Sequence, residues 1–196
     1  MLERLRGAKA GWALTGSFCT IPQLFDQISS LKEAGCEIFP ILSPSVSGLD
    51  TRFQSAESIQ ARLFEITGKL PIETLQQAEP IGPKKLLDVL VVLPATGNTL
   101  AKLAAGIADT SVTLAVKAHL RNERPVIIGV STNDGLSGNA KSIGILLNTR
   151  NIYFVPFFQD DPIGKTRSLV CHAPLVKETI AEALNGRQIQ PLLYRG

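Results

Sequence analysis

Five short apolar runs, each closed by small or turn-forming residues, recur along the chain. They are Gly11 to Thr15, Cys36 to Leu42, Leu87 to Leu93, Pro125 to Ser131 and Asn151 to Phe157. Runs of this length that are apolar at nearly every position are typical of strands covered on both faces. We therefore predict five buried β-strands.

Between these runs, apolar residues recur three or four positions apart, which is the spacing of one helix face. The series are Leu24, Ile28 and Leu31; Ile59, Leu63 and Ile66; Leu100, Leu103, Ala104 and Ile107; and Ile143, Leu146 and Leu147. A last helix is expected to begin near Pro174 and to end at Asn185-Gly186, because glycine can take the left-handed cap conformation. Residues 187–196 should follow it as an irregular arm.

The alternation of strands and helices predicts the fold class. Parallel strands need long crossover connections, and those crossovers are right-handed. We expect an α/β fold: a three-layer, Rossmann-like (flavodoxin-like) open parallel sheet with helices on both faces, forming a single domain over residues 1–196. Ligands of such sheets bind at the carboxyl ends of the strands.

Four of the predicted strands end in small polar residues. The segments are Thr15-Gly16-Ser17, Ser43-Pro44-Ser45, Pro94 to Thr99, and Ser131 to Gly135. Pro94 to Thr99 combines a tight turn with the start of a helix, whose free amide groups can hold a phosphate or another anion. Each segment alone is more typical of an ordinary cap or turn than of a binding site, but four at one sheet edge favour a binding site. No GxGxxG or GxxxxGK[ST] motif is present, which disfavours a dinucleotide fingerprint and a P-loop.

Composition narrows the function classes. Hydrophobic residues make up 44% of the 196 residues, charged residues make up 19%, and the net charge is +3. Scattered Lys and Arg with few aromatics argue against nucleic-acid binding. Three widely separated cysteines suit reduced thiols and indicate neither disulfides nor a metal site. Without a signal peptide or membrane-spanning run, the sequence favours a cytoplasmic protein and no membrane association.

Four features together are recognisable at the level of a protein family. They are the Thr-Gly-Ser turn after the first strand, the serine after the second strand, the segment Pro94 to Thr110 and the later Thr-Asn-Asp turn. With these features the chain resembles the homo-oligomeric flavin-containing Cys decarboxylase family of flavoproteins. Further segments match one subfamily over nearly the whole chain: Ala78 to Lys85, Lys117 to Asn122, Ser131 to Leu136, Tyr153 to Asp161, and Gln188 to Pro191.

The resemblance implies FMN bound at the strand ends. The positions that match the family's contacts are Thr15, Gly16, Ser17, Ser43, Pro94, Thr96, Asn98 and Thr99. Amide and hydroxyl donors suit an FMN phosphate without a dense positive cluster. The resemblance also implies a homo-oligomer, a trimer or a multiple of it.

The subfamily implies a specific activity. Its members act with a nicotinamide-dependent A subunit, so NAD(P) is expected on that partner and not on this chain. The pair converts a dihydro precursor to pyridine-2,6-dicarboxylate in the mother-cell cytoplasm of sporulating bacteria. Aromatising the ring removes two electrons and two protons, and a flavin is chemically competent to accept them.

A dicarboxylate substrate draws attention to polar and cationic side chains. Lys102, Asn133 and Lys84 are the candidates for substrate binding, although each lysine is more often a solvated surface charge. Lys102 is the strongest of them, because a cation near a helix start opposes the helix dipole and asks for another explanation. Asn98 and His119 are the candidates for catalysis, and His119 is equally suited to a helix face or an interface.

Two departures from the decarboxylase branch leave alternatives open. Decarboxylases of the family carry a histidine before the third strand, where this chain reads Glu79-Pro80-Ile81-Gly82. They also carry a proline-rich clamp with methionine and asparagine, where this chain has Ser131 to Gly135. Cysteine decarboxylation is therefore disfavoured. The alternatives are an FMN-dependent decarboxylase of another small carboxylate and a non-catalytic partner that stabilises or activates the A subunit.

Overall fold

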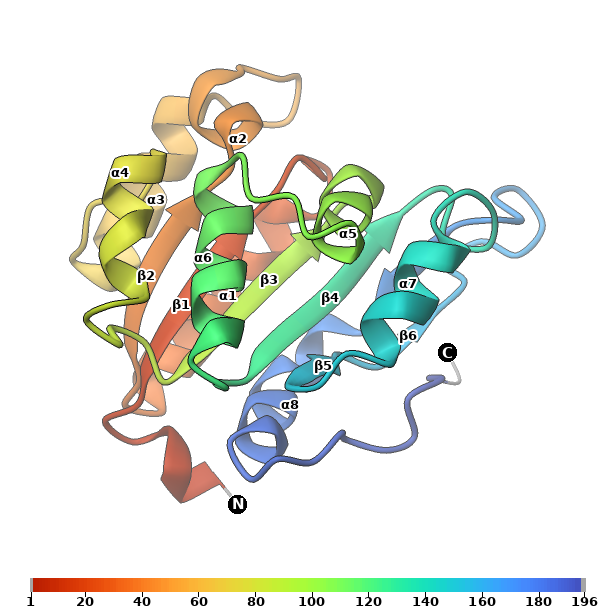
Figure 1. Cartoon of the computed structure of the whole chain (residues 1–196). Helices are drawn as coiled ribbons and strands as arrows, with labels where there is room; N and C mark the ends of the chain where they lie inside the picture. Colours follow the sequence, from red (N-terminus) through yellow and green to blue (C-terminus); the bar gives the residue numbers. More distant parts are fainter. Residues whose placement is uncertain (1, 195–196) are drawn as a thin grey trace.

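The computed structural model describes residues 2–194 and places a seven-stranded sheet between two layers of helices (Figure 1). The strands follow the order β2-β1-β3-β4-β7-β6, and β5 also pairs with β4. Their bounds are β1 Lys9–Leu14, β2 Glu37–Leu42, β3 Val89–Ala95, β4 Val126–Thr132, β5 Ile152–Phe154, β6 Phe157–Phe158 and β7 Leu169–Cys171. Every residue of β3 is buried, so this strand forms the centre of the core.

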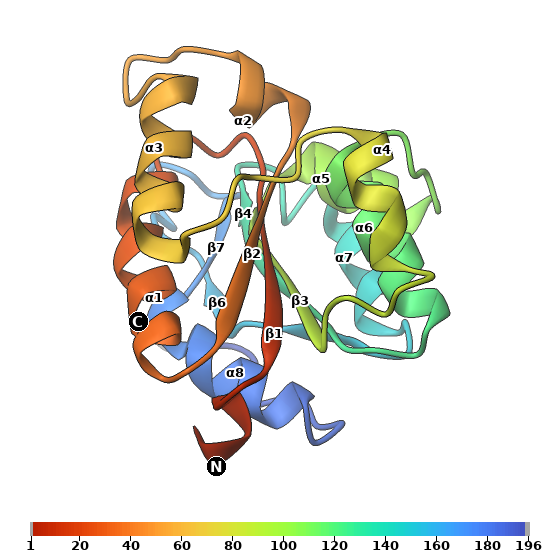
Figure 2. The ribbon, with the colours of Figure 1, turned by 90° about the vertical axis from the view of Figure 1, so that its left-hand side faces the viewer.

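The helices divide between the two faces of the sheet (Figure 2). One face carries α1 (Ile21–Glu33), α3 (Ala56–Thr67) and α8 (Val176–Ala183). The other carries α4 (Leu75–Ala78), α5 (Gly97–Ala104), α6 (Ser111–Arg121) and α7 (Ala140–Leu147). A short helix, α2 (Pro44–Gly48), follows β2, and 3₁₀ helices cover Leu2–Leu5, Glu79–Ile81 and Ala173–Leu175. The predicted three-layer, Rossmann-like fold class is confirmed.

The sheet is mixed, and this corrects the expectation of a wholly parallel one. The run predicted as one strand over 151–157 divides before Pro156 into β5 and β6, because proline has no N–H to donate to a ladder. Strand β5 pairs in parallel with residues 126–128 of β4, whereas β7 pairs antiparallel with residues 131–132. The β6–β7 hairpin therefore takes the carboxyl half of the β4 edge.

The C-terminal arm is irregular, as expected, but it is held against the sheet. Gln188 donates to the carbonyl oxygen of Phe154 and accepts from its amide, each at 2.7 Å. Phe157 then donates to the carbonyl of Leu192 and accepts from the amide of Tyr194. These bonds satisfy backbone groups on β5 and β6 that no neighbouring strand reaches. The last two residues of the predicted arm, 195–196, lie outside the described residues.

Candidate functional site

The carboxyl ends of β1, β2, β3 and β4 meet at one edge of the sheet, where two adjoining cavities open. The larger has a volume of about 470 Å³ and the smaller of about 280 Å³. Gly16 and Thr96 line both, so these residues form the boundary between the cavities. The site predicted at the strand ends therefore coincides with two cavities at this edge of the sheet.

The larger cavity brings together most of the residues predicted to contact a cofactor. Hydroxyl groups dominate its wall, and the apolar side chains of Phe18 and Val112 complete it. Of the residues predicted from the sequence it contains Thr15, Gly16, Ser43, Thr96, Asn98, Thr99 and Lys102. Ser43 stands at the N-cap position of α2 without capping it, and its hydroxyl makes one long hydrogen bond, of 3.4 Å, to the hydroxyl of Ser45.

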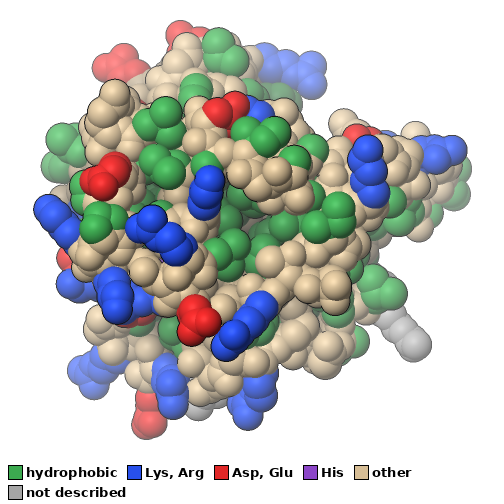
Figure 3. Space-filling view, viewed as in Figure 1, with side chains coloured by type: hydrophobic (Ala, Val, Ile, Leu, Met, Phe, Trp, Pro, Cys, Tyr) green, Lys and Arg blue, Asp and Glu red, His purple; other side chains and the backbone are tan. Residues whose placement is uncertain are grey.

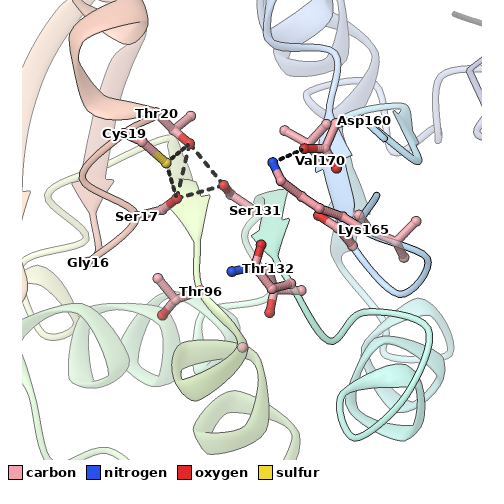
Figure 4. A pocket seen from close by; sticks show the side chains of 14 residues that line it. Gly16, Ser17, Cys19, Thr20, Thr96, Ser131, Thr132, Asp160, Lys165 and Val170 are labelled. Atoms are coloured by element: carbon pink, nitrogen blue, oxygen red, sulfur yellow. Dashed lines mark hydrogen bonds and ion pairs between the residues drawn. The ribbon is translucent and has the colours of Figure 1, made fainter. Parts of the chain in front are cut away.

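The smaller cavity gathers a second set of polar side chains (Figure 4). From the predicted residues it contains Gly16, Ser17, Thr96 and Asn133. Others in its wall were not predicted as site residues: Cys19, Thr20, Asp160, Lys165 and Ser168. Asp160, Lys165 and Ser168 belong to the loop between β6 and β7, a hairpin that no pattern in the sequence indicated.

Two side chains hold the irregular end of β3 in place: Trp12 in β1 and Thr15 directly after β1. The register between β3 and β4 shifts between Val92 and Ala95, so the backbone around Pro94 leaves the ladder. The indole Nε1 of Trp12 donates to the carbonyl oxygen of Leu93 at 3.0 Å. The Thr15 hydroxyl donates to the carbonyl oxygen of Pro94 at 2.7 Å. Buried carbonyls that the irregularity frees from the ladder are satisfied in this way.

Thr15 also receives a hydrogen bond, from the amide of Thr96 at 3.1 Å. Its side chain is 1% exposed, and its hydroxyl therefore joins the ends of β1 and β3 inside the protein. The sequence predicted Thr15 as a cofactor contact. The structure places it in the cavity wall with its hydroxyl engaged by the backbone, as a residue that positions the turn.

The start of α5 packs against the turn that follows β4. A Cβ atom on Gly97 would lie 2.5 Å from Asn139 Nδ2, 2.7 Å from Thr132 Oγ1 and 2.8 Å from Asp134 Oδ1. A Cβ atom here would push these side chains aside, so glycine permits the close approach. The Asp134 carboxylate accepts from Thr132 and from Asn139, at 2.5 and 2.7 Å, and so holds the turn together. The side chains of Thr132 and Asp134 thus pack against the first residue of α5.

Lys102 lines the larger cavity, but its expected position on the helix was wrong. Helix α5 ends at Ala104, so Lys102 lies in its last turn, where a positive charge is favourable to the helix dipole. Its Nζ donates to both carboxylate oxygens of Asp109, at 3.0 and 2.7 Å. This hydrogen bond lowers the pKa of Asp109. The negative charge beside Lys102 is therefore that of Asp109, where we expected a bound anion.

Lys84 and His119 lie away from both cavities. Lys84 is exposed in the turn that precedes β3, at the amino end of the sheet. His119 lies near the end of α6, where its charged neighbours are Arg124 and Asp88. Because both residues flank the amino ends of strands, neither can reach a ligand at the carboxyl edge of the same chain.

His119 is instead a buried residue of the core. Its side chain is 1% exposed and its Nε2 has no hydrogen-bond partner among residues 2–194. Desolvation and the nearby Arg124 lower its pKa from 6.5 to about 4. The imidazole is therefore neutral in the folded protein at neutral pH.

This burial predicts a loss of stability in mild acid. The unfolded chain takes up a proton at His119 as the pH falls through 6.5, whereas the folded chain resists protonation down to about 4. The burial of neutral His119 thus contributes fully to the free energy of unfolding above pH 6.5. Up to about 3 kcal/mol of that free energy is lost as the pH falls from 6.5 to about 4. Urea unfolding of wild type and His119→Gln between neutral pH and the folded pKa tests this. The wild-type stability should fall more steeply, and parallel curves would contradict the assignment.

The three cysteines differ in accessibility. Cys19 is exposed beside the smaller cavity, whereas Cys36 and Cys171 are buried. Burial raises the pKa of the Cys36 thiol to about 11 and that of Cys171 to about 12. Cys19 is thus the thiol that a polar reagent in solvent reaches first.

Other site types find no support in the part of the chain that the structure describes. Within residues 2–194, no group of three or more His, Cys, Asp or Glu side chains is placed to hold a metal ion. The helices of the same residues are too short or too polar to span a bilayer. Figure 3 shows Lys and Arg side chains dispersed over one face, with acidic and apolar side chains among them.

Comparison with known proteins agrees with this geometry. A model of the flavoprotein family matches residues 2–143, which include β1 to β4 and both sides of the larger cavity. The chain belongs to the flavoprotein family. It is 41% identical to the B subunit of dipicolinate synthase from Bacillus subtilis strain 168, over 100% of this chain and 99% of the relative.

Solved structures of similar proteins extend the comparison. The B subunit of dipicolinate synthase from Bacillus halodurans superposes on this flavoprotein with a TM-score of 0.90 at 40% identity, covering 97% of this chain and 98% of that one. The FMN-dependent cysteine decarboxylase SpaF superposes with a TM-score of 0.68 at 22% identity, covering 91% and 98%. The Bacillus halodurans protein is similar to this chain in both sequence and fold. The comparison with SpaF shows a shared fold.

Proposed function

We propose that the larger cavity binds FMN. The observation that carries this proposal is the convergence of polar groups from three strand ends on one cavity of about 470 Å³. Gly16 and Ser43 offer an amide and a hydroxyl suited to phosphate. The exposed Asn98 offers a side-chain amide to another part of the cofactor. Phe18 and Val112 offer apolar surface to a flat ring. Membership of the flavoprotein family supports this cofactor.

We further propose that the chain is the B subunit of dipicolinate synthase. Identity of 41% to the Bacillus subtilis protein over essentially both full lengths supports this. The partner is then the A subunit of the same enzyme, with NAD(P) bound on that partner. The proposed reaction converts dihydrodipicolinate to dipicolinate with loss of two hydrogen atoms. A bound flavin would supply an acceptor for the two electrons.

The remaining assignments follow from this proposal. The protein would act in the mother-cell cytoplasm during sporulation, as a single domain that assembles into a trimer or a multiple of it. Asn98 would face the reacting ring, because it lies in the first turn of α5 at the wall of the cavity and its side chain is exposed. A residue of this kind orients a substrate or cofactor and does not itself exchange protons at neutral pH.

Reconstitution tests the proposal. Oxidation of dihydrodipicolinate is measured with only the A subunit, with only this chain and with both together, each with and without FMN. We expect full activity only with both chains and FMN. Asn98→Ala should lower the activity of the pair at least about tenfold, as loss of an orienting contact does. Asn148→Ala, at the end of α7 and outside both cavities, is the matched control.

The same assay separates the alternatives. If the pair is equally active without FMN and with Asn98→Ala, this chain is a non-catalytic partner of the A subunit. If this chain alone releases carbon dioxide from a small carboxylate, it is a decarboxylase. Either result would overturn the proposed oxidative role.

A further inference from the structure

Two segments that the proposed flavin site does not use meet near the amino end of the sheet. They are residues 79–85, which precede β3, and residues 117–122 at the end of α6. A Cβ atom on Gly82 would lie 3.1 Å from Ala118 Cβ and 3.1 Å from Arg121 Nη2. The side-chain amide of Asn122 donates to the carbonyl oxygen of Gly82 at 2.8 Å, across 40 positions of the chain. The two segments are therefore in direct contact.

Both segments present cations to solvent. Lys84, Lys85, Lys117 and Arg121 are all exposed. Lys117 and Arg121 are four positions apart on α6 and are therefore neighbours on one helix face. The Arg121 guanidinium lies beside Gly82, two residues before Lys84. Figure 3 shows several Lys and Arg side chains over the C-terminal half of α6 and the segment beside it, at the left of the view. We call these four residues the amino-end patch.

The charges of the amino-end patch are not balanced within the protein. Across residues 2–194, none of its four cations forms an ion pair. Two nearby carboxylates are already engaged, because Asp88 pairs with Arg124 at 3.3 Å and Glu123 pairs with Arg150 at 3.4 Å. Like charges four residues apart on a helix repel each other. An anionic partner would therefore be stabilised at this surface.

Hydrogen bonds hold the backbone of the amino-end patch in one conformation. The amides of Lys84 and Lys85 donate to the carbonyls of Pro80 and Gly82, each at 3.1 Å. Arg124 Nη1 donates to the carbonyl oxygen of Lys85 at 3.2 Å. A surface that is already ordered loses little conformational entropy when a partner binds. The amino-end patch is thus preformed for docking.

The surroundings of the amino-end patch favour a protein as the partner. Helix α4 packs against α6 and presents Leu75, which is 41% exposed, and Pro83 is exposed next to Lys84. Apolar side chains beside charged ones are typical of protein interfaces. Residues 79–88 and 117–124 contain no Phe, Tyr or Trp on which nucleic-acid bases could stack. None of the four cations lines either cavity at the carboxyl edge.

We propose that the amino-end patch docks an acidic surface of the A subunit. This inference rests on the proposed function, which gives the chain that partner. The cations would attract the acidic surface and raise the rate of association, while the apolar side chains beside them would be covered in the complex. Because the amino-end patch shares no residue with either cavity, this docking leaves the residues of the proposed flavin site uncovered.

Charge reversal tests the docking surface. Binding of the purified A subunit is followed by biolayer interferometry at about 50 mM and about 500 mM salt, since salt screens attraction between exposed charges. The double variant Lys84→Glu/Arg121→Glu changes one cation in each segment. It should lower the association rate constant at least about tenfold at the lower salt concentration, and by less at the higher one. The wild-type rate should itself fall as salt is added.

The double variant Arg52→Glu/Lys141→Glu is the matched control. It changes the net charge equally, and both of its residues are exposed and lie outside the amino-end patch and both cavities. It should associate with the A subunit at least several-fold faster than the patch variant, and both variants should unfold at the wild-type temperature.

Three results would overturn the docking surface while leaving the proposed partnership intact. They are equal association rates for the two variants, a wild-type rate that does not depend on salt, and a patch variant that changes only the assembly of this chain with itself in analytical ultracentrifugation. Binding of duplex DNA that the wild type shows and the patch variant loses would assign the surface to nucleic acid and overturn the proposal as well. Absence of any binding between wild type and the A subunit would instead contradict the proposed function, so the two failures are distinguishable.

Discussion

Replacing Trp12 by alanine is expected to lower the free energy of unfolding by about 3–5 kcal/mol, as for other large-to-small changes in a core. Trp12 is 0% exposed and fills the centre of β1. The substitution also removes the indole donor to the carbonyl oxygen of Leu93, 3.0 Å away. The cavity and the unsatisfied carbonyl both arise beneath the turn after β3, so cofactor affinity should fall together with stability.

Trp12→Phe separates the two contributions. Phenylalanine keeps most of the buried ring but not the N–H, so we expect a smaller loss of about 1–3 kcal/mol, mainly from the unpaired carbonyl. Because Trp12 is the one tryptophan of the chain, unfolding in urea is followed by circular dichroism and not by fluorescence. If alanine and phenylalanine destabilise the protein equally, the packing contribution assigned to the ring is wrong.

Replacing Thr15 by valine is the second change with a large expected effect. The two side chains have nearly the same shape, but valine leaves the Thr96 amide and the Pro94 carbonyl without their partner. We expect stability to fall by about 1–3 kcal/mol, the cost of buried backbone groups that lose a hydrogen bond. The turn that carries Thr96 and Asn98 would lose its attachment to β1, so FMN should bind at least about tenfold more weakly.

Thr15→Ser is the matched control, because it keeps the hydroxyl and loses only a methyl group. It should retain most of the affinity for FMN, measured by titration at one temperature and pH. A serine variant as weak as the valine variant would show that the methyl contact, and not the hydrogen bonds, positions the turn.

The fold class and the composition of the cavity wall could be predicted from the sequence because both depend on local patterns. Uniformly apolar runs identified β1 to β4, and small polar residues after them identified the strand ends. Parallel topology then brought those ends together at one edge. Seven predicted residues consequently line the larger cavity: Thr15, Gly16, Ser43, Thr96, Asn98, Thr99 and Lys102.

The features that the sequence did not reveal depend on contacts between distant segments. Strands β6 and β7 have two and three residues, too few for a periodic pattern, and β7 forms against the carboxyl half of β4. No pattern in the sequence therefore indicated that Lys165 lines a cavity. Lys102 stabilises a helix end because α5 ends at Ala104, and the sequence pattern did not show where this helix ends. The burial of His119 depends on tertiary packing, which the spacing of apolar residues along the chain does not show.

Titration of flavin-free protein with FMN tests the central claim most directly. Calorimetry of the wild type, Ser43→Ala and Ser47→Ala compares the Ser43 hydroxyl, which lies in the cavity wall and caps no helix, with a neighbouring serine on α2 outside both cavities. We predict saturable binding of one FMN per chain, weakened at least about fivefold by Ser43→Ala, as for loss of a hydrogen bond to phosphate, and unchanged by Ser47→Ala. Absence of FMN binding to the wild type, or equal affinity in all three proteins, would contradict a flavin site at this edge of the sheet.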